Sequence, residues 1–108
     1  MAETVLVVDD DQELRELIAD FLEAHSYRVL RSADGLDAMA QIERARPSAV
    51  VLDLNMPRLG GLEALRRARA VHPSLTVVTV TGMSDPHLRE EALTLGASAF
   101  LTKPLDLG

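Results

Sequence analysis

The stretch Ala49-Val50-Val51-Leu52-Asp53-Leu54-Asn55-Met56-Pro57 decides the fold of this 108-residue chain. A short apolar run with β-branched residues is typical of a strand that is buried on both faces of a parallel sheet. Pro57 ends the run, because proline has no N–H to donate to a sheet and restricts the residue before it. Asp53 is therefore predicted to lie where a buried strand ends and a loop begins. Ligands bind at this edge of open α/β sheets, although a carboxylate there could equally cap the following turn.

Similar apolar runs recur along the chain, and helical patterns separate them. The expected strands cover residues 4–8, 27–30, 49–53, 75–80 and 97–101. The expected helices cover 12–24, lie around 36–42 and around 62–68, and run from Pro86 to Leu95. Asp11 and Asp85 stand where they can cap the first and the last of these helices. Strict alternation with short connections predicts right-handed β-α-β units, and therefore an α/β fold with a parallel sheet and helices on both faces.

Composition predicts a single ordinary globular domain. Hydrophobic residues make up 47% and charged residues 26% of the chain. The absence of cysteine excludes disulfides and thiolate metal sites. The formal net charge of -6 argues against direct binding of nucleic acid through phosphate contacts. The first residues lack a signal-peptide pattern and no apolar run has the length of a membrane span, so we expect a cytoplasmic domain without membrane contact.

Reactive polar residues stand at the ends of four of the five expected strands. Asp9 and Asp10 follow the first strand, Asp53 ends the third, Thr81 follows the fourth, and Lys103 follows the last. The carboxyl ends of parallel strands share one edge of the sheet, so we expect three carboxylates, a hydroxyl and an ammonium to face one crevice. The alternative is that Asp9 and Asp10 only cap the first helix and never meet Asp53.

Three carboxylates at one edge need a counter-charge. Two carboxylates about 5 Å apart repel each other by about 3 kcal/mol at an effective dielectric constant of ~20. One lysine cannot balance three of them, so a hard divalent cation is expected, and Mg²⁺ is the usual one in phosphate chemistry. Aspartate can attack phosphorus as a covalent nucleophile, while metal, lysine and hydroxyl stabilise the charge of the transferred group. These residue types together predict phosphoryl transfer.

Residues 4–104 resemble the receiver domain of two-component response regulators in the order and type of these motifs. The resemblance implies a flavodoxin-like, doubly wound sheet of five parallel strands in the order 2-1-3-4-5. It implies that Asp53 is the phospho-acceptor. It also implies that Asp9 and Asp10 hold Mg²⁺ together with Asp53 and the main-chain carbonyl of Asn55.

The resemblance assigns roles to residues near the end of the chain as well. Thr81 is implied to be the switch hydroxyl, and Phe100 matches the aromatic switch position. Lys103 is implied to pair with the phosphate, with a cis peptide bond into Pro104. The implied function is to take a phosphoryl group from a sensor histidine kinase or phosphotransfer protein, and to switch conformation so as to control an output domain or partner. Such a domain catalyses only its own phosphorylation and dephosphorylation.

The chain departs from the family pattern at two places. Where the family commonly has Asp-Gly after the Met-Pro loop, this chain has Gly60-Gly61, which we expect to alter only the local turn. The family continues into a fifth helix, whereas this chain stops at Gly108, so the fifth helix is expected to be truncated or absent. Residues 1–108 are then expected to be the N-terminal receiver domain of a longer response regulator. A sheet face left partly bare predicts self-association, with a homodimer as one form, or reduced stability.

Three other classes of protein share parts of this pattern. A Mg²⁺-dependent phosphatase that works through an aspartyl phosphate typically has a second carboxylate two residues after the nucleophile, where this chain has Asn55. A flavin-binding electron carrier needs a phosphate loop after the first strand, where Asp9-Asp10-Asp11 would repel phosphate. A receiver-like module that is never phosphorylated is disfavoured by the presence of all five pocket residues.

Overall fold

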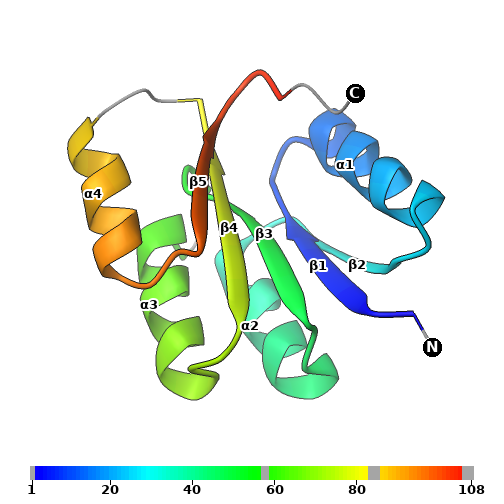
Figure 1. Ribbon diagram of the computed structural model, residues 1–108, viewed down its shortest axis with the longest axis horizontal. Coiled ribbons are helices and arrows are strands. Elements are labelled where there is room, and N and C mark those ends of the chain that lie inside the picture. The colour runs from blue at the N-terminus through cyan, green and yellow to red at the C-terminus, as the bar shows by residue number, and fades with distance from the viewer. Residues whose placement is uncertain (1, 57–58, 83–85, 106–108) are drawn as a thin grey trace.

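The structure, a computed structural model, describes residues 2–56, 59–82 and 86–105. Strands and helices alternate along them (Figure 1). The strands are β1 (Thr4–Val8), β2 (Arg28–Ser32), β3 (Ala49–Asp53), β4 (Thr76–Thr81) and β5 (Ala99–Thr102). The helices are α1 (Gln12–Ala24), α2 (Gly35–Ala45), α3 (Gly61–Val71) and α4 (Pro86–Thr94). All neighbouring strands pair in parallel, in the order β2-β1-β3-β4-β5, which confirms the predicted fold.

Three strands begin later than predicted. Strand β4 begins one residue late, at Thr76, and β2 and β5 begin late because helix ends use their expected first residues. The N–H of Tyr27 donates to the carbonyl of Leu22 at 3.1 Å and so closes α1. The N–H of Ala97 donates to the carbonyl of Ala92 at 3.0 Å and closes α4 in the same way. The predicted starts of β2 and β5 were therefore wrong by one and two residues, and β2, β4 and β5 all end one or two residues later than expected. Asp11 caps α1 as predicted, whereas Asp85 lies outside the described residues.

The two faces of the sheet carry separate apolar cores. On one face, strand residues such as Leu6 and Val50 pack with Leu65 of α3 and Ala92 of α4. Residues of α2 join this larger core. On the other face, Val7 and Val29 pack with Ile18 and Ala19 of α1. The alternation of side chains along each buried strand thus feeds both cores, and α1 is the only described helix that contributes buried residues to the second one.

Helix α1 covers its side of the sheet only in part. Val51 and Val78 on this side are half-buried and, with Leu22 and Thr76, help to line a hollow of about 390 Å³. Leu101 of β5 is 45% exposed. Among the described residues no helix follows β5, which agrees with the expected truncated or absent fifth helix. In the described part of the chain, every helix is too short or too polar to cross a membrane.

We expect this open side to make the 108-residue chain self-associate, or to lower its stability relative to a longer version in which the side is covered. Covering a few hundred Å² of apolar surface at ~25 cal/mol per Å² stabilises by several kcal/mol. Sedimentation at micromolar concentration and denaturant melts of both versions measure the two outcomes. A monomer with the same free energy of unfolding as the longer version would contradict this expectation.

Candidate functional site

Three carboxylates meet at the carboxyl edge of the sheet. Asp9 follows β1, Asp10 is the next residue, and Asp53 is the last residue of β3. One carboxylate oxygen from each lies within 4.8 Å of the others. Asp9 and Asp53 are each only 2% exposed, whereas Asp10 is exposed. The alternative in which Asp9 and Asp10 only cap α1 is therefore wrong, since Asp11 provides that cap.

Lys103 brings the ammonium that the sequence predicted to the same place. Its Nζ lies 3.3 Å from Oδ2 of Asp9 and 3.4 Å from Oδ2 of Asp53. The main-chain N–H of Lys103 donates to the carbonyl of Thr81 at 2.8 Å, and the bond to Pro104 is cis, as the resemblance implies. Lys103 is also the single lysine of the chain, whose other basic residues apart from histidine are arginines. A compact ammonium fits between two carboxylates where a planar guanidinium would need more room.

Burial and charge act against each other on the acid and the base of this site. Burial raises the pKa of the Asp53 carboxyl, and the charge of Asp9 raises this pKa further. The main-chain N–H of Asn55 and the ammonium of Lys103 oppose the rise. For Lys103, burial alone would lower the pKa, but the charges of Asp53 and Asp9 outweigh it and raise the pKa. Lys103 thus stays charged, and the neighbouring Asp53 carboxyl keeps its proton to a higher pH than an ordinary carboxyl does.

The remaining predicted residues lie at different distances from the carboxylates. The N–H of Asn55 donates to Oδ1 of Asp53 at 3.1 Å, while the residue itself is exposed. Thr81 is fully buried and is the next residue after Val80, which pairs with Asp53. Phe100 does not join the carboxylates: it is half-buried and packs against the larger core. The structure therefore brings Asn55 and Thr81 to the site. Phe100 packs against the larger apolar core instead.

Gly61 lets α3 approach the end of β3 closely. A Cβ at Gly61 would lie 2.3 Å from the Cα of Leu54 and 2.7 Å from the main-chain oxygen of Asp53. Gly60 is the N-cap residue of α3 and provides no side-chain hydrogen bond, while a Cβ there would meet nothing within 4 Å. The expectation that the altered pair changes only the local turn agrees with this geometry. The need for glycine at position 61 comes from packing and had no signal of its own in the sequence.

A second residue that the sequence did not point to, Arg15, contacts the site. The guanidinium of Arg15 on α1 donates from Nη1 to the main-chain carbonyl of Asp9 at 3.0 Å. In sequence, a charged residue on an amphipathic helix is typical of a solvated face, so nothing distinguished Arg15 from its neighbours. Its side chain is 17% exposed, which is low for an arginine on a surface helix.

The donor set fits a hard divalent cation. Oxygens that share one Mg²⁺ at ~2.1 Å lie up to ~4.2 Å apart, so carboxylate oxygens already within 4.8 Å of one another need only small adjustments. Three carboxylates against one ammonium leave excess negative charge, which a cation would neutralise. The pocket can therefore hold a cation beside a buried carboxylate that an ammonium and a main-chain N–H orient.

Comparison with known proteins assigns the family. A family model described as the response regulator receiver domain matches residues 5–108. The chain belongs to this family. The domain is 40% identical over 103 residues to response regulator MprA of Mycobacterium sp. (strain KMS), covering 95% of this chain and 45% of that protein. The receiver domain thus spans less than half the length of the curated relatives that it matches.

Solved receiver domains have the same architecture. A CheY-like receiver domain protein from Methanospirillum hungatei JF-1 superposes with a TM-score of 0.95 at 27% identity, covering 99% of this chain and 86% of that chain. The receiver domain of NtrX from Brucella abortus gives a TM-score of 0.90 at 32% identity, covering 95% and 88%. The resemblance stated from the sequence is therefore confirmed for both family and fold.

Removing the Asp53 charge is expected to stabilise this receiver domain. Because the pKa of Asp53 is raised on folding, the folded state holds the proton more tightly than the unfolded chain. The stability of the metal-free domain therefore falls as pH rises from the ordinary carboxyl pKa through the raised one. At neutral pH we expect Asp53→Asn to be more stable by on the order of 1 kcal/mol. The gain should vanish at a pH below the ordinary carboxyl pKa, and thermal melts over this range without Mg²⁺ measure it. Equal stability at neutral pH would contradict the argument.

Proposed function

We propose that this receiver domain accepts a phosphoryl group on Asp53 in a Mg²⁺-dependent reaction, from the phosphohistidine of a sensor kinase or phosphotransfer protein. The observation that carries the proposal is the buried Asp53 carboxylate at the end of β3, which shares one ammonium with a second buried carboxylate, that of Asp9. Membership of the receiver family favours this function over a phosphatase or a flavin carrier. The acceptor chemistry, rather than turnover of a substrate, is then the role of the site.

The residues divide the reaction between them. Lys103 and the N–H of Asn55 each hold one oxygen of Asp53, which fixes the carboxylate for attack. An oxygen of Asp53 bonds to phosphorus as the nitrogen–phosphorus bond of the phosphohistidine breaks. The leaving imidazole keeps the electron pair of that bond and takes a proton from solvent water. Asp9, Asp10, Asp53 and the main-chain carbonyl of Asn55 would hold Mg²⁺. A cation held there would reduce the repulsion between these carboxylates and the incoming phosphoryl oxygens. Lys103 then stays close to those oxygens as they arrive.

The buried Thr81 hydroxyl offers a route from the modified site to the surface. A phosphoryl group on Asp53 adds acceptor oxygens at the end of β3, beside the strand that carries Thr81. Movement of Thr81 towards them would change the space available to Phe100, which lies on the adjacent strand β5. A local change of charge would thereby shift the population of surface conformations, through which the domain controls an output domain or partner.

We expect Thr81→Ala to accept the phosphoryl group but to lose most of the coupled change at Phe100. The substitution removes the hydroxyl while leaving Asp53 and Lys103 in place. NMR shifts of the Phe100 ring with and without phosphorylation measure the coupling. The same shift in the variant as in the unsubstituted domain would show that the coupling does not pass through Thr81.

Acetyl phosphate with Mg²⁺ tests the acceptor without a partner protein. We expect the intact mass to rise by one phosphoryl group in the presence of Mg²⁺ and to stay unchanged when the metal is chelated. Asp53→Asn should abolish the gain, while the matched control Asp20→Asn, at an exposed position on α1, should keep it. Full labelling of Asp53→Asn would place the acceptor elsewhere.

A further inference from the structure

Both main-chain polar groups of Asp9 are tied to neighbouring elements. Its N–H donates to the carbonyl of Ser32 at the end of β2, at 3.0 Å. Its carbonyl accepts from Nη1 of Arg15, also at 3.0 Å. Its carboxylate in turn accepts from the N–H of Asp11 at 2.9 Å and contacts Lys103. The turn between β1 and α1, which carries Asp9 and Asp10, is thus held from both sides, and Arg15 provides one of the two main-chain ties.

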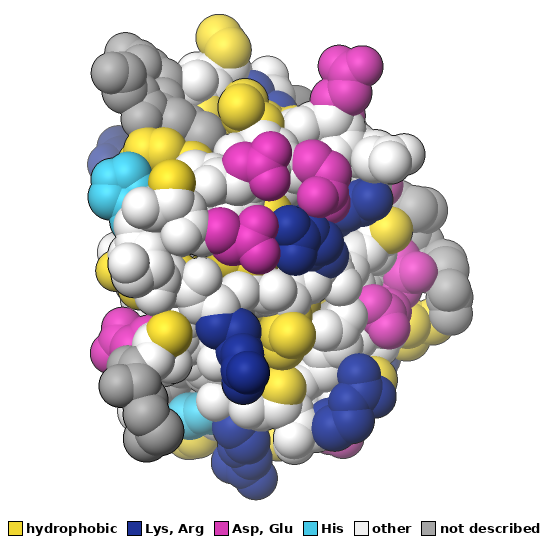
Figure 2. All heavy atoms as spheres, turned by 90° about the vertical axis from the view of Figure 1, so that its right-hand side faces the viewer, with side chains coloured by type: hydrophobic (Ala, Val, Ile, Leu, Met, Phe, Trp, Pro, Cys, Tyr) yellow, Lys and Arg dark blue, Asp and Glu magenta, His cyan; other side chains and the backbone are white. Residues whose placement is uncertain are grey.

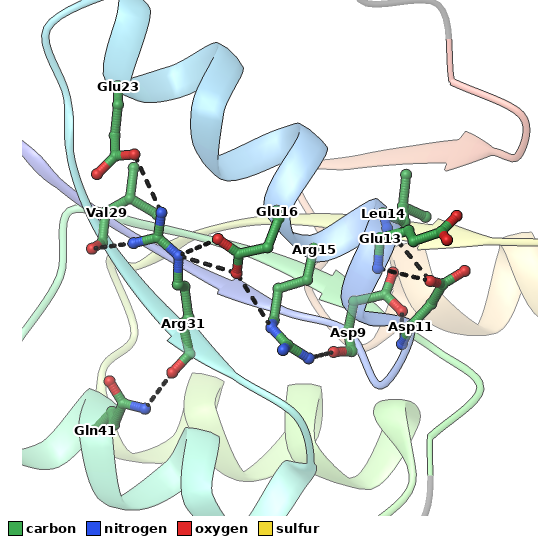
Figure 3. A network of polar contacts seen from close by, with 10 residues as sticks. All are labelled: Asp9, Asp11, Glu13, Leu14, Arg15, Glu16, Glu23, Val29, Arg31 and Gln41. Atoms are coloured by element: carbon green, nitrogen blue, oxygen red, sulfur yellow. Dashed lines mark hydrogen bonds and ion pairs between the residues drawn. The ribbon is translucent and has the colours of Figure 1, made fainter.

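Arg15 is itself part of a polar network that reaches two other elements (Figure 3). Its Nε lies 3.7 Å from a carboxylate oxygen of Glu16. Glu16 accepts two hydrogen bonds from Nε of Arg31 on β2, at 3.0 and 3.1 Å, and Nη2 of Arg31 donates to Glu23 at 3.1 Å. The main-chain carbonyl of Arg31 accepts from Gln41 on α2. Figure 2 shows the acidic and basic side chains gathered on this side of the molecule.

We propose that Arg15 is a positioning residue, which sets the β1–α1 turn so that Asp9 and Asp10 face a shared cation. The proposal rests on the Mg²⁺ site of the proposed function. Arg15 does not touch the carboxylate oxygens that would bind the metal; it acts through the Asp9 carbonyl. Removing a group that orients a metal ligand without binding the metal itself typically lowers metal affinity by about 10-fold or more.

The charge of Arg15 alone would have the opposite effect, which makes the proposal testable. A guanidinium close to the carboxylates repels a divalent cation, so removing only its charge would tighten Mg²⁺ binding, and salt would screen this effect. Removing a positioning hydrogen bond instead weakens binding, and the weakening persists at high salt. The sign of the change in the dissociation constant therefore separates the two roles.

The experiment is an amide NMR titration of the 108-residue chain with MgCl₂, at low and high KCl. Arg15→Met removes the charge and the donors but keeps an aliphatic chain. We expect its dissociation constant for Mg²⁺ to rise about 10-fold at both salt concentrations. Arg15→Lys retains one ammonium donor, and its dissociation constant for Mg²⁺ should lie between those of the unsubstituted chain and Arg15→Met. In metal-free protein, the amide signals of Asp9, Asp10 and Asp11 should shift in Arg15→Met.

Arg69→Met is the matched control. Arg69 on α3 also donates to main-chain carbonyls, those of Pro73, Leu75 and Gly96, but these lie in connections away from the carboxylates. Its loss should lower the melting temperature and leave the dissociation constant for Mg²⁺ unchanged.

An unchanged or lower dissociation constant in Arg15→Met overturns the proposal while leaving the metal site intact. If Arg15→Met does not fold, the dissociation constant of Arg15→Lys is compared instead: a higher constant than in the unsubstituted chain supports the proposal, and an unchanged or lower one overturns it. An unsubstituted domain that binds no Mg²⁺ overturns both the metal site and the role of Arg15.

Discussion

Replacing Lys103 by methionine is expected to destabilise the metal-free domain by about 2 kcal/mol at neutral pH. The ammonium lies 3.3 and 3.4 Å from the two buried carboxylates, and its removal leaves Asp9 and Asp53 facing each other without a positive charge between them. Mg²⁺ should restore most of the lost stability, because a cation that binds only the folded state adds about 2.7 kcal/mol at a concentration of ~100 Kd. Urea melts with and without MgCl₂ measure both effects.

Lys103→Arg is the matched variant, since it keeps the positive charge but replaces a compact ammonium with a planar group. We expect it to retain most of the stability of the metal-free domain and to take up less phosphoryl group from acetyl phosphate, because the larger group crowds the carboxylates. If Lys103→Met is as stable as the unsubstituted domain without metal, the lysine does not balance the carboxylates and the electrostatic account of the site is wrong.

Gly61→Ala is expected to lower the free energy of unfolding by about 2 kcal/mol or more, the range for atoms forced into packed space. The added methyl group would lie 2.3 Å from the Cα of Leu54 and 2.7 Å from the main-chain oxygen of Asp53, and backbone atoms cannot rotate away. Either α3 or the end of β3 must move. Because β3 carries the proposed acceptor, Asp53, we also expect slower uptake of a phosphoryl group. Denaturant melts and the rate of mass gain with acetyl phosphate measure the two effects.

Gly60→Ala provides the control one residue away. A Cβ at Gly60 meets nothing within 4 Å, and its backbone conformation is open to any residue. The lower cap preference of alanine and its smaller unfolded-state entropy oppose each other, so the change should stay within about 0.5 kcal/mol. Equal effects of the two substitutions would mean that the close approach at Gly61 does not constrain the acceptor strand.

The sequence predicted the fold because its central strands are buried on both faces. Runs such as 4–8 and 49–53 are apolar throughout, so they stand out from the helices around them. The edge strands β2 and β5 carry weaker signals, since several of their residues are exposed or half-exposed. Their starts were misjudged at Tyr27 and Ala97, whose N–H groups close the preceding helices. Helix caps and strand starts compete for the same residues, and local composition does not decide between them.

The carboxylates of the site were predictable for a different reason, namely topology. Once the strands are parallel, Asp9 and Asp53 must lie at one edge, whatever their distance in sequence. The contacts of Arg15 and Gly61 depend on how α1 and α3 settle against that edge. A hydrogen bond from an arginine to a main-chain carbonyl, or a close approach of two backbones, leaves no pattern in spacing or hydropathy. Such residues are found only when the packed structure is known.

Mapping the modified residue on the unsubstituted domain tests most directly whether Asp53 receives the phosphoryl group. After treatment with acetyl phosphate and Mg²⁺, borohydride reduces an aspartyl phosphate to homoserine, which peptide fragmentation can place in the sequence. We expect homoserine at position 53 alone, and none when the metal is chelated. Homoserine at Asp9 or Asp10, or a phosphoryl group on a residue that borohydride does not reduce, would contradict the account.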